Sequence, residues 1–141
     1  MDDSVSLTGG CLCGAVRYRV TEAPRWTCMC HCESCRRQTG AASVPFIGVA
    51  RSALSFSGEA PQDFESSQGV TRSFCRRCGS PIAYATVKRP DEVDLFVGTL
   101  DDPGGAPPAF HVHTAERIAW LSIDDGLPQH ARSGEGGSEP G

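Results

Sequence analysis

Eight cysteines carry the chemistry that this sequence can perform, and they fall into three tight clusters. The clusters are Cys11-x-Cys13, Cys28-x-Cys30-x-Cys32-x-x-Cys35 and Cys75-x-x-Cys78. Cysteine thiolates bind Zn²⁺, which takes four tetrahedral ligands in a structural site and keeps one position open in a catalytic site. A chain with one set of four cysteines and a second set that can stop at three therefore favours an enzyme with two zinc ions.

The first and last clusters are predicted to share one closed zinc site. One intervening residue places the sulfurs of Cys11 and Cys13 on the same face of a strand, and the two residues between Cys75 and Cys78 are usual for a metal knuckle. Four thiolates leave no position for a substrate, so we expect a structural site that joins the N-terminal strand to a distant hairpin. The alternative is two unrelated pairs of reduced cysteines.

The middle cluster is expected to hold a second, catalytic zinc through Cys30, Cys32 and Cys35. Cys28 either closes this site as a fourth ligand or leaves it open as a small buried hydrophobe. We favour the open site, because three same-face cysteines on one strand would bind a single tetrahedral ion in strained geometry. His31 would lie on the opposite face of that strand, where we expect it to form hydrogen bonds instead of binding metal.

An open zinc site with three thiolates has a definite chemical character. The three negative charges weaken the Lewis acidity of the ion relative to three histidines, so the site is a poor generator of hydroxide. It is a better host for a soft ligand such as a substrate thiol. The site therefore indicates chemistry between a thiol and a carbonyl group, without identifying the substrate.

Length, composition and cysteine usage indicate one cytoplasmic domain. The chain has 141 residues and a mass of 15.0 kDa, which suits a single core. We expect one zinc-binding domain over 1–130 and a disordered tail over 131–141, because the last nine residues, SGEGGSEPG, lack large apolar side chains. No secretory signal and no apolar run of ~20 residues is present. Thiols stay reduced in the cytosol, which argues against the alternative of a disulfide framework.

The charge of the chain argues against nucleic acid as a partner. The net charge is −4, and the basic groupings lie at cysteine clusters, Arg36-Arg37 directly after Cys35 and Arg76-Arg77 between Cys75 and Cys78. A nucleic-acid groove needs a concentrated basic face, which the sequence lacks. These arginines could instead offset the charge of the thiolates or hold an anionic substrate.

The elements that must position the cysteines are predicted to be short strands separated by turns. In 16–20, apolar and basic residues alternate strictly, as in a half-buried strand. A hairpin is expected to carry the knuckle at its tip, with Gly79 in the positive-φ conformation that such a turn needs. One short helix is expected over 33–39, ending at Gly40. The strands are expected at 16–20, 43–49, 54–57, 71–74, 82–85, 93–97, 111–114 and 118–123. An all-β fold with minimal helix follows.

Five segments, read in order, resemble a known family. They are GGCLCGAVRY, CHCESCRRQTG, FCRRCGSPIAY, VDLFVGTLDDP and HVHTAERIAWLSIDDGLPQ. The family is the glutathione-dependent formaldehyde-activating enzymes (the GFA domain), which is grouped with the relatives of centromere protein V. The resemblance covers about 9–129, and the whole cysteine pattern with its flanking residues is far more specific than any one pair.

The resemblance implies a fold, a metal content and an activity. The fold is similar to that of the Mss4-like, zinc-stapled β proteins. A structural zinc on Cys11, Cys13, Cys75 and Cys78 and a catalytic zinc on Cys30, Cys32 and Cys35 are implied. The implied activity is that of a carbon–sulfur lyase, S-(hydroxymethyl)glutathione synthase, which reversibly joins formaldehyde to glutathione. Cys28 is an additional cysteine outside the family motif.

The residues that follow the last ligand are candidates for substrate binding. Arg36 and Arg37 could bind the carboxylates of glutathione, since the guanidinium fork matches a carboxylate; the alternative for each is a structural or solvated arginine. Gln38, Thr39 and Gly40 offer polar groups to a peptide.

The C-terminal part of the chain is expected to be mainly structural. His111 and His113 could line the pocket, although structural histidines are more common. Trp120 is expected in the core, and Asp124 and Asp125 are expected in a turn.

Two other classes of function are alternatives to the enzyme. One is a non-catalytic zinc-binding module that binds a protein partner, and the other is a chromatin role, against which the acidic charge counts. An exchangeable metal position would separate the enzyme from a binding module, which has no need of one.

Overall fold

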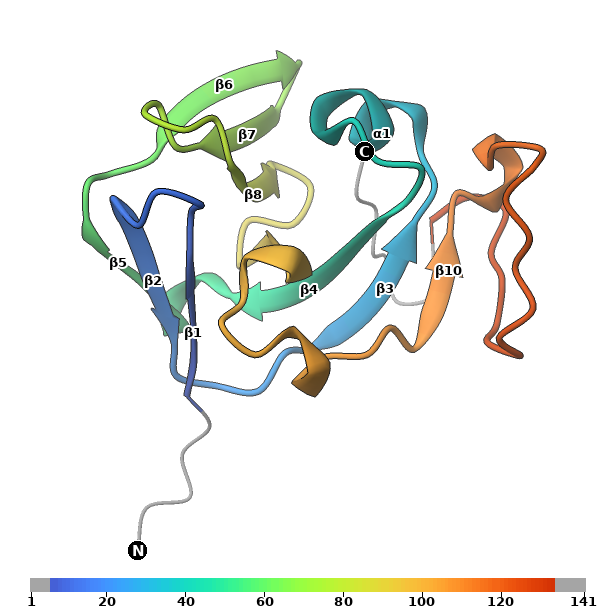
Figure 1. Ribbon diagram of the computed structural model, residues 1–141, viewed down its shortest axis with the longest axis horizontal. Coiled ribbons are helices and arrows are strands. Elements are labelled where there is room, and N and C mark those ends of the chain that lie inside the picture. Colours follow the sequence, from blue (N-terminus) through green and yellow to red (C-terminus); the bar gives the residue numbers. More distant parts are fainter. Residues whose placement is uncertain (1–5, 134–141) are drawn as a thin grey trace, which may run out of the picture.

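The chain folds into two β-sheets, as the computed structural model in Figure 1 shows for residues 6–133. The smaller sheet is antiparallel and has the order β1-β2-β5. Its strands are β1 (Leu7–Gly10), β2 (Val16–Val20) and β5 (Leu54–Gly58).

The larger sheet has seven strands in the order β10-β3-β4-β9-β8-β7-β6. Neighbouring strands are antiparallel except β10 and β3, which are parallel. The strands are β3 (Trp26–Cys30), β4 (Val44–Ala50), β6 (Gln62–Ser67), β7 (Val70–Phe74), β8 (Pro81–Thr86), β9 (Glu92–Phe96) and β10 (Phe110–Val112). The short 3₁₀ turns are η1 (Arg51–Ala53), η2 (Val97–Thr99), η3 (Pro103–Gly105) and η4 (Thr114–Glu116). The prediction of an all-β fold is confirmed.

The larger sheet is covered on both faces, and each face has its own core. On one face, Ile47 and Leu95 pack with Val16 of the smaller sheet. On the other face, Phe46 packs with Cys35 of the helix α1 (Glu33–Thr39). β4 contributes to both cores because successive side chains of a strand point to opposite faces. The two faces separate the two sets of cysteines described below.

The helix α1 has the predicted bounds because its two ends are capped locally. Cys32 is the N-cap, and its Sγ accepts a hydrogen bond from the backbone N–H of Cys35 at 3.3 Å. Gly40 takes the left-handed conformation (φ 73°) and donates its N–H to the carbonyl of Arg36 at 2.7 Å. The short helix therefore starts within the middle cysteine cluster and turns Cys35 towards the sheet.

The segment 118–123 is not the strand that we predicted. The guanidinium of Arg117 donates to the carbonyls of Ile118, Ala119 and Leu121, and the N–H of Leu121 donates to the carbonyl of Ile118. These bonds occupy carbonyl groups that a strand would offer to its neighbour. Trp120, which we expected in the core, is 72% exposed.

Two strands were not predicted, and two predicted strands end early, one of which is the strand expected over 111–114, which ends at Val112. All residues of β6 are exposed, so no apolar alternation marks this edge strand. β1 has the sequence LTGG, whose glycines disfavour strands in general. The strand expected over 93–97 ends at Phe96, because Val97 begins η2.

The C-terminal end of the described chain is tied back by backbone hydrogen bonds. His113 donates to the carbonyl of Arg132, and Ala115 donates to that of Ala131. These first residues of the predicted tail therefore belong to the folded part, whereas 134–141 lie outside the described residues. Within 6–133, no helix has the length and apolarity needed to cross a bilayer.

Candidate functional site

The cysteines of the N-terminal pair and of the knuckle meet on the face of the larger sheet that packs against the smaller sheet. We call these four residues the first cluster. The Sγ atoms of Cys11, Cys13, Cys75 and Cys78 all lie within 4.8 Å of one another. Cys11 and Cys13 are 3.6 Å apart, and Cys13 and Cys75 are 3.8 Å apart. Sulfurs bound about 2.3 Å from Zn²⁺ in a tetrahedron are separated by about 3.8 Å, so this donor set fits the ion.

Two tight turns position these four sulfurs. Cys11 and Cys13 lie in the turn between β1 and β2, and not on a strand face as we predicted, because Gly14 reverses the chain with φ 85°. The knuckle between β7 and β8 is confirmed: Gly79 has φ 80° and donates its N–H to the carbonyl of Cys75 at 2.7 Å. The cluster therefore joins two hairpins that are distant in sequence.

Polar groups lie next to three of the four sulfurs of this first cluster; the exception is Cys13, whose pKa is raised to about 11 because a backbone hydrogen bond at Ala15 is outweighed by desolvation and the neighbouring sulfurs. The backbone N–H of Val16 donates to Cys11 Sγ at 3.3 Å, and that of Arg77 donates to Cys75 Sγ at 3.4 Å. The hydroxyl of Ser80 lies 3.2 Å from Cys78 Sγ and lowers the pKa of that thiol to about 5. Hydrogen bonds to a thiolate stabilise its charged form, the form that binds metal.

Three further cysteines, which we call the second cluster, meet on the opposite face of the larger sheet. Cys30 ends β3, Cys32 caps α1 and Cys35 lies in its first turn; their Sγ atoms are within 4.8 Å of one another. Cys30 and Cys35 are 3.8 Å apart, again the edge of a zinc–sulfur tetrahedron. The expectation that Cys32 continues the strand is wrong, because the chain leaves β3 at His31. This departure lets three closely spaced cysteines surround one point.

Cys28 lies outside this second cluster. It is fully buried in the core of the same face and pairs with Phe46 across β3 and β4. Burial raises the pKa of its thiol, as expected for a cysteine that packs as a hydrophobe. Within the described residues, the cluster therefore stops at three sulfurs.

The three buried thiols of the second cluster differ in pKa. The pKa of Cys32 is lowered because Cys30 and Cys35 donate hydrogen bonds to its sulfur, and the same contacts together with burial raise the pKa of Cys30. Three thiolates so close together need a cation to offset their charge. The donor set and its burial thus fit a divalent ion.

Arg72 of β7 points at the second cluster, and sequence reasoning missed it. Its side chain is buried, and both terminal nitrogens lie 3.8 Å from Cys35 Sγ. Its Nη1 donates to Gln38 Oε1 at 3.1 Å. The polar sequence VTRSF hid this residue: Thr71 and Ser73 line a cavity on the other face of the sheet, and alternation turns Arg72 to the cysteines.

A chain of histidines adjoins the second cluster. His31 Nε2 lies 2.9 Å from His111 Nδ1, and His111 Nε2 lies 2.8 Å from Asp125 Oδ2. His31 therefore forms hydrogen bonds as predicted, and burial followed by the charge of His111 lowers its pKa to about 4. Asp125 also forms the expected turn, because its Oδ1 accepts the N–H of Leu127.

His113 adopts a strained backbone conformation beside the second cluster. It has φ 57°, and among the described residues its buried Nε2 has no hydrogen-bond partner. Its Nδ1 lies 3.8 Å from Glu116 Oε2. Non-glycine residues in this conformation are uncommon and concentrate at functional sites.

The five candidate substrate residues divide into two groups. Arg36, Arg37 and Gly40 line a surface hollow of about 450 Å³. The other lining residues are Ala41, Ala42, Ile118 and Trp120. Gln38 and Thr39 instead turn inward, to Arg72 and to the carbonyl of Cys35.

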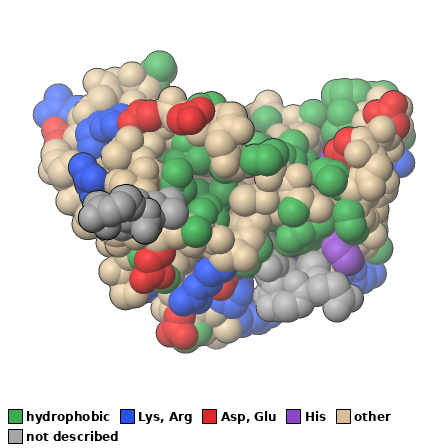
Figure 2. Space-filling view, turned by 90° about the horizontal axis from the view of Figure 1, so that it is seen from below, with side chains coloured by type: hydrophobic (Ala, Val, Ile, Leu, Met, Phe, Trp, Pro, Cys, Tyr) green, Lys and Arg blue, Asp and Glu red, His purple; other side chains and the backbone are tan. Residues whose placement is uncertain are grey.

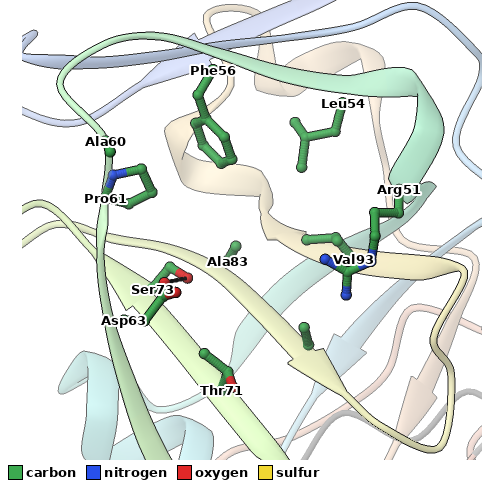
Figure 3. Close-up of a pocket in the computed structure, with 11 residues that line it drawn as sticks. Arg51, Leu54, Phe56, Ala60, Pro61, Asp63, Thr71, Ser73, Ala83 and Val93 are labelled. Atoms are coloured by element: carbon green, nitrogen blue, oxygen red, sulfur yellow. Dashed lines mark hydrogen bonds between the residues drawn. The ribbon is translucent and has the colours of Figure 1, made fainter.

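A separate cavity of about 500 Å³ lies between the two sheets, on the face away from the second cluster (Figure 3). Leu54, Phe56 and Val93 form apolar walls, and Asp63 accepts a hydrogen bond from Ser73 at its polar side. No cysteine lines this cavity, so we do not assign the thiol chemistry to it.

The charged side chains do not form a nucleic-acid surface on the face shown in Figure 2. Acidic and basic side chains lie beside one another there, without a continuous basic patch.

The fold and the two cysteine clusters define an all-β protein with two candidate metal centres. The chain belongs to the family described as glutathione-dependent formaldehyde-activating enzyme, which it matches over residues 6–116. The resemblance seen in the motifs is therefore confirmed.

Individual relatives agree with this family. A Halomonas elongata protein named “Putative glutathione-dependent formaldehyde-activating enzyme” is 28% identical over 127 residues, which cover 84% of this chain and 81% of the relative. An uncharacterized lyase of Schizosaccharomyces pombe is 33% identical over 92 residues, 63% of this chain and 66% of the relative. Together they point to an enzyme of lyase type.

A solved structure shares the fold. The crystal structure of a Rhodobacter sphaeroides protein superposes with a TM-score of 0.56 and 21% identity, covering 87% of this chain and 98% of that one.

Proposed function

We propose that this protein is a zinc-dependent carbon–sulfur lyase that joins and splits an aldehyde and glutathione or a related thiol. The observation that carries the proposal is the second cluster, in which Cys30, Cys32 and Cys35 come together and Cys28 does not. Three protein ligands leave a position for substrate, as in other catalytic zinc sites. The first cluster then holds a second, structural zinc through Cys11, Cys13, Cys75 and Cys78.

The reaction forms one carbon–sulfur bond. The thiol loses its proton, its sulfur adds to the carbonyl carbon as the C=O π bond opens, and the former carbonyl oxygen takes up that proton; the reverse step releases both reactants. When bound, zinc supplies a soft Lewis acid that stabilises a thiolate at neutral pH. We assign the holding of that proton to His113, whose buried Nε2 has no hydrogen-bond partner among the described residues.

The hollow beside α1 is the proposed site for the peptide part of glutathione. Arg36 and Arg37 would bind its carboxylates, Gly40 would leave room for its backbone, and the exposed ring of Trp120 would cover it. Gln38 and Thr39 would shape this side of α1 through their inward hydrogen bonds. We place the reaction in the cytoplasm, where thiols stay reduced and can bind metal.

The direct test is exchange NMR on glutathione and formaldehyde with catalytic amounts of the zinc-loaded protein. We expect faster exchange than in solution, and loss of that acceleration in Cys32→Ser. Cys28→Ala is the matched control, because it removes a buried cysteine of the same region that is not a ligand. Ophthalmic acid, which has a methyl group in place of the thiol, should bind much more weakly than glutathione.

Equal exchange rates with and without protein would remove the formaldehyde-activating assignment. If ophthalmic acid also bound as well as glutathione, sulfur would play no part in binding. The non-catalytic module that binds a protein partner would then be the better description.

A further inference from the structure

We propose that Arg72 is a positioning residue that makes the three-cysteine site selective for an anionic sulfur ligand. The inference rests on the proposed function in one respect, which is that the site accepts a fourth ligand. Arg72 would act through Cys35, without contact with solvent or substrate, since only 3% of the residue is exposed.

The guanidinium of Arg72 is held on several sides with its open edge on the cluster. Nε donates to Ser66 Oγ at 3.2 Å, and Nη1 donates to Gln38 Oε1 at 3.1 Å. Arg72 Cζ lies 5.0 Å from the centroid of the Tyr84 ring, a cation–π contact. Both Nη atoms then face Cys35 Sγ at 3.8 Å. The fork is therefore fixed in orientation before any ligand arrives.

The positive charge of Arg72, in contact with Cys35, affects which fourth ligand the site prefers. Three thiolates and a divalent ion have a net charge of −1, and a fourth thiolate would make the buried complex −2. Buried, uncompensated charge is strongly unfavourable, whereas a cation in contact with a ligand sulfur offsets one unit of it. Arg72 therefore favours an anionic fourth ligand over a neutral one. It also draws electron density from Cys35, which strengthens the metal as an acceptor.

Gln38 gains a role from the same geometry. Proposed first as a substrate residue, it holds Nη1 of Arg72 from the second turn of α1. Movement of α1 would therefore change the distance between the guanidinium and the cluster.

The experiment uses full-length protein with zinc in the four-cysteine site and Co²⁺ in the three-cysteine site. Arg72→Met keeps a long aliphatic side chain but removes the charge, and Arg72→Lys keeps the charge but loses the fork. Thr71→Val is the matched control on the same strand, facing the other cavity. The readouts are the thiolate-to-cobalt charge-transfer band and the affinities for glutathione, which binds as a thiolate, and for neutral imidazole.

We expect the charge-transfer band to move to lower energy in Arg72→Met, because loss of the guanidinium charge raises the energy of the sulfur electrons. Glutathione should bind roughly tenfold or more weakly, the scale of a charge-assisted hydrogen bond, while imidazole changes less than about twofold. The band position and glutathione affinity of Arg72→Lys should lie between those of the wild type and Arg72→Met, and Thr71→Val should match the wild type. If Arg72→Met does not fold, Arg72→Lys and Gln38→Leu give the same comparison with a smaller expected effect.

An unmoved band, or equal weakening of both ligands, would overturn the role of Arg72. Failure of the proposed function looks different: the wild-type cobalt site would then bind neither glutathione nor imidazole. The band still tests Arg72 in that case, because it reports on Cys35 whether or not a fourth ligand enters.

Discussion

The two cysteine clusters lie on opposite faces of one sheet and differ in almost every physical respect. The first takes its sulfurs from two hairpin turns, and Cys13 and its neighbour Leu12 are exposed to solvent. The second takes its sulfurs from six consecutive positions, Cys30 to Cys35, and all three are buried. The more exposed cluster, in which Cys11 and Cys75 are still buried, has four sulfurs, and the fully buried cluster has three.

We infer from this difference that the number of ligands and the length of chain between them decide the role of each cluster, and that burial does not. A metal on the first cluster joins segments 62 residues apart, as the Cys13–Cys75 contact shows, and removes much freedom from the unfolded chain. A metal on the second closes a loop that β3 and the caps of α1 already shape. Metal at the first cluster should therefore stabilise the fold. Metal at the second cluster should contribute little to stability and can take part in catalysis.

The largest effect is expected for a ligand of the first cluster. Cys75→Ser should give insoluble or unfolded protein, because structural zinc contributes about 10 kcal/mol or more, comparable to the whole stability of a domain. Far-UV circular dichroism and thermal unfolding measure the outcome. Cys28→Ala, equally buried but not a ligand, is the control and should lose only about 1–2 kcal/mol. A soluble Cys75→Ser protein with an unchanged melting curve would refute the structural role.

A ligand of the second cluster should behave differently. Cys32→Ser is expected to bind one zinc per chain instead of two and to keep its far-UV spectrum, with a loss of about 1–2 kcal/mol from one buried polar substitution. Mild chelation of the wild type should remove the same zinc first. If both metals left together while the protein unfolded, the division of roles between the clusters would be wrong.

Alkaline pH should lower the free energy of unfolding through a buried tyrosine in the core that holds the first cluster. Tyr18 of β2 is buried there, and burial raises its pKa to about 12, with its hydroxyl 2.7 Å from Thr99 Oγ1. Above about pH 10 the unfolded state releases the phenolic proton while the folded state keeps it, so stability falls as pH rises towards 12. The loss should be about 2 kcal/mol between about pH 9 and 11.5.

Urea unfolding of wild type and Tyr18→Phe at both pH values isolates this effect. The variant should be less stable than wild type at about pH 9, where it lacks the hydrogen bond, and the gap should shrink at about pH 11.5. Parallel decreases in the two proteins would exclude Tyr18 as the cause.

The smallest effect on stability is expected at the hollow beside α1. Trp120→Ala should change the free energy of unfolding by no more than about 0.5 kcal/mol, because the ring is exposed. It should nevertheless weaken glutathione about threefold or more if the ring covers the peptide. The exposed Phe64 of β6 offers a control, since Phe64→Ala removes an exposed aromatic ring that does not line this hollow. Equal glutathione affinity in all three proteins would move the peptide site elsewhere.

The predictable parts of this structure are those that local rules decide. The bounds of α1 follow from Gly40 and the polar start at Glu33, and the knuckle follows from Gly79 after a paired cysteine. The two ligand sets follow from spacing, because a metal demands several sulfurs at short range. The strict alternation of β2 identified its buried face.

The unpredictable parts depend on contacts between distant segments. Arg72 lies in a polar strand, and only the pairing of β7 with β8 and the position of α1 bring it to Cys35. His111 and Asp125 meet across a loop without periodicity. Trp120 is exposed because Arg117 binds the carbonyls around it, a competition that composition does not reveal.

The most direct test of the contrast between the clusters is sulfur counting at zinc by X-ray absorption. Wild-type protein with two zinc ions should show about 3.5 sulfurs per zinc, the mean of a closed and an open site, with lighter atoms in the remaining position. Cys32→Ser, retaining only the first site, should rise to about four. Four sulfurs per zinc in the wild type, or no rise in the variant, would contradict the account.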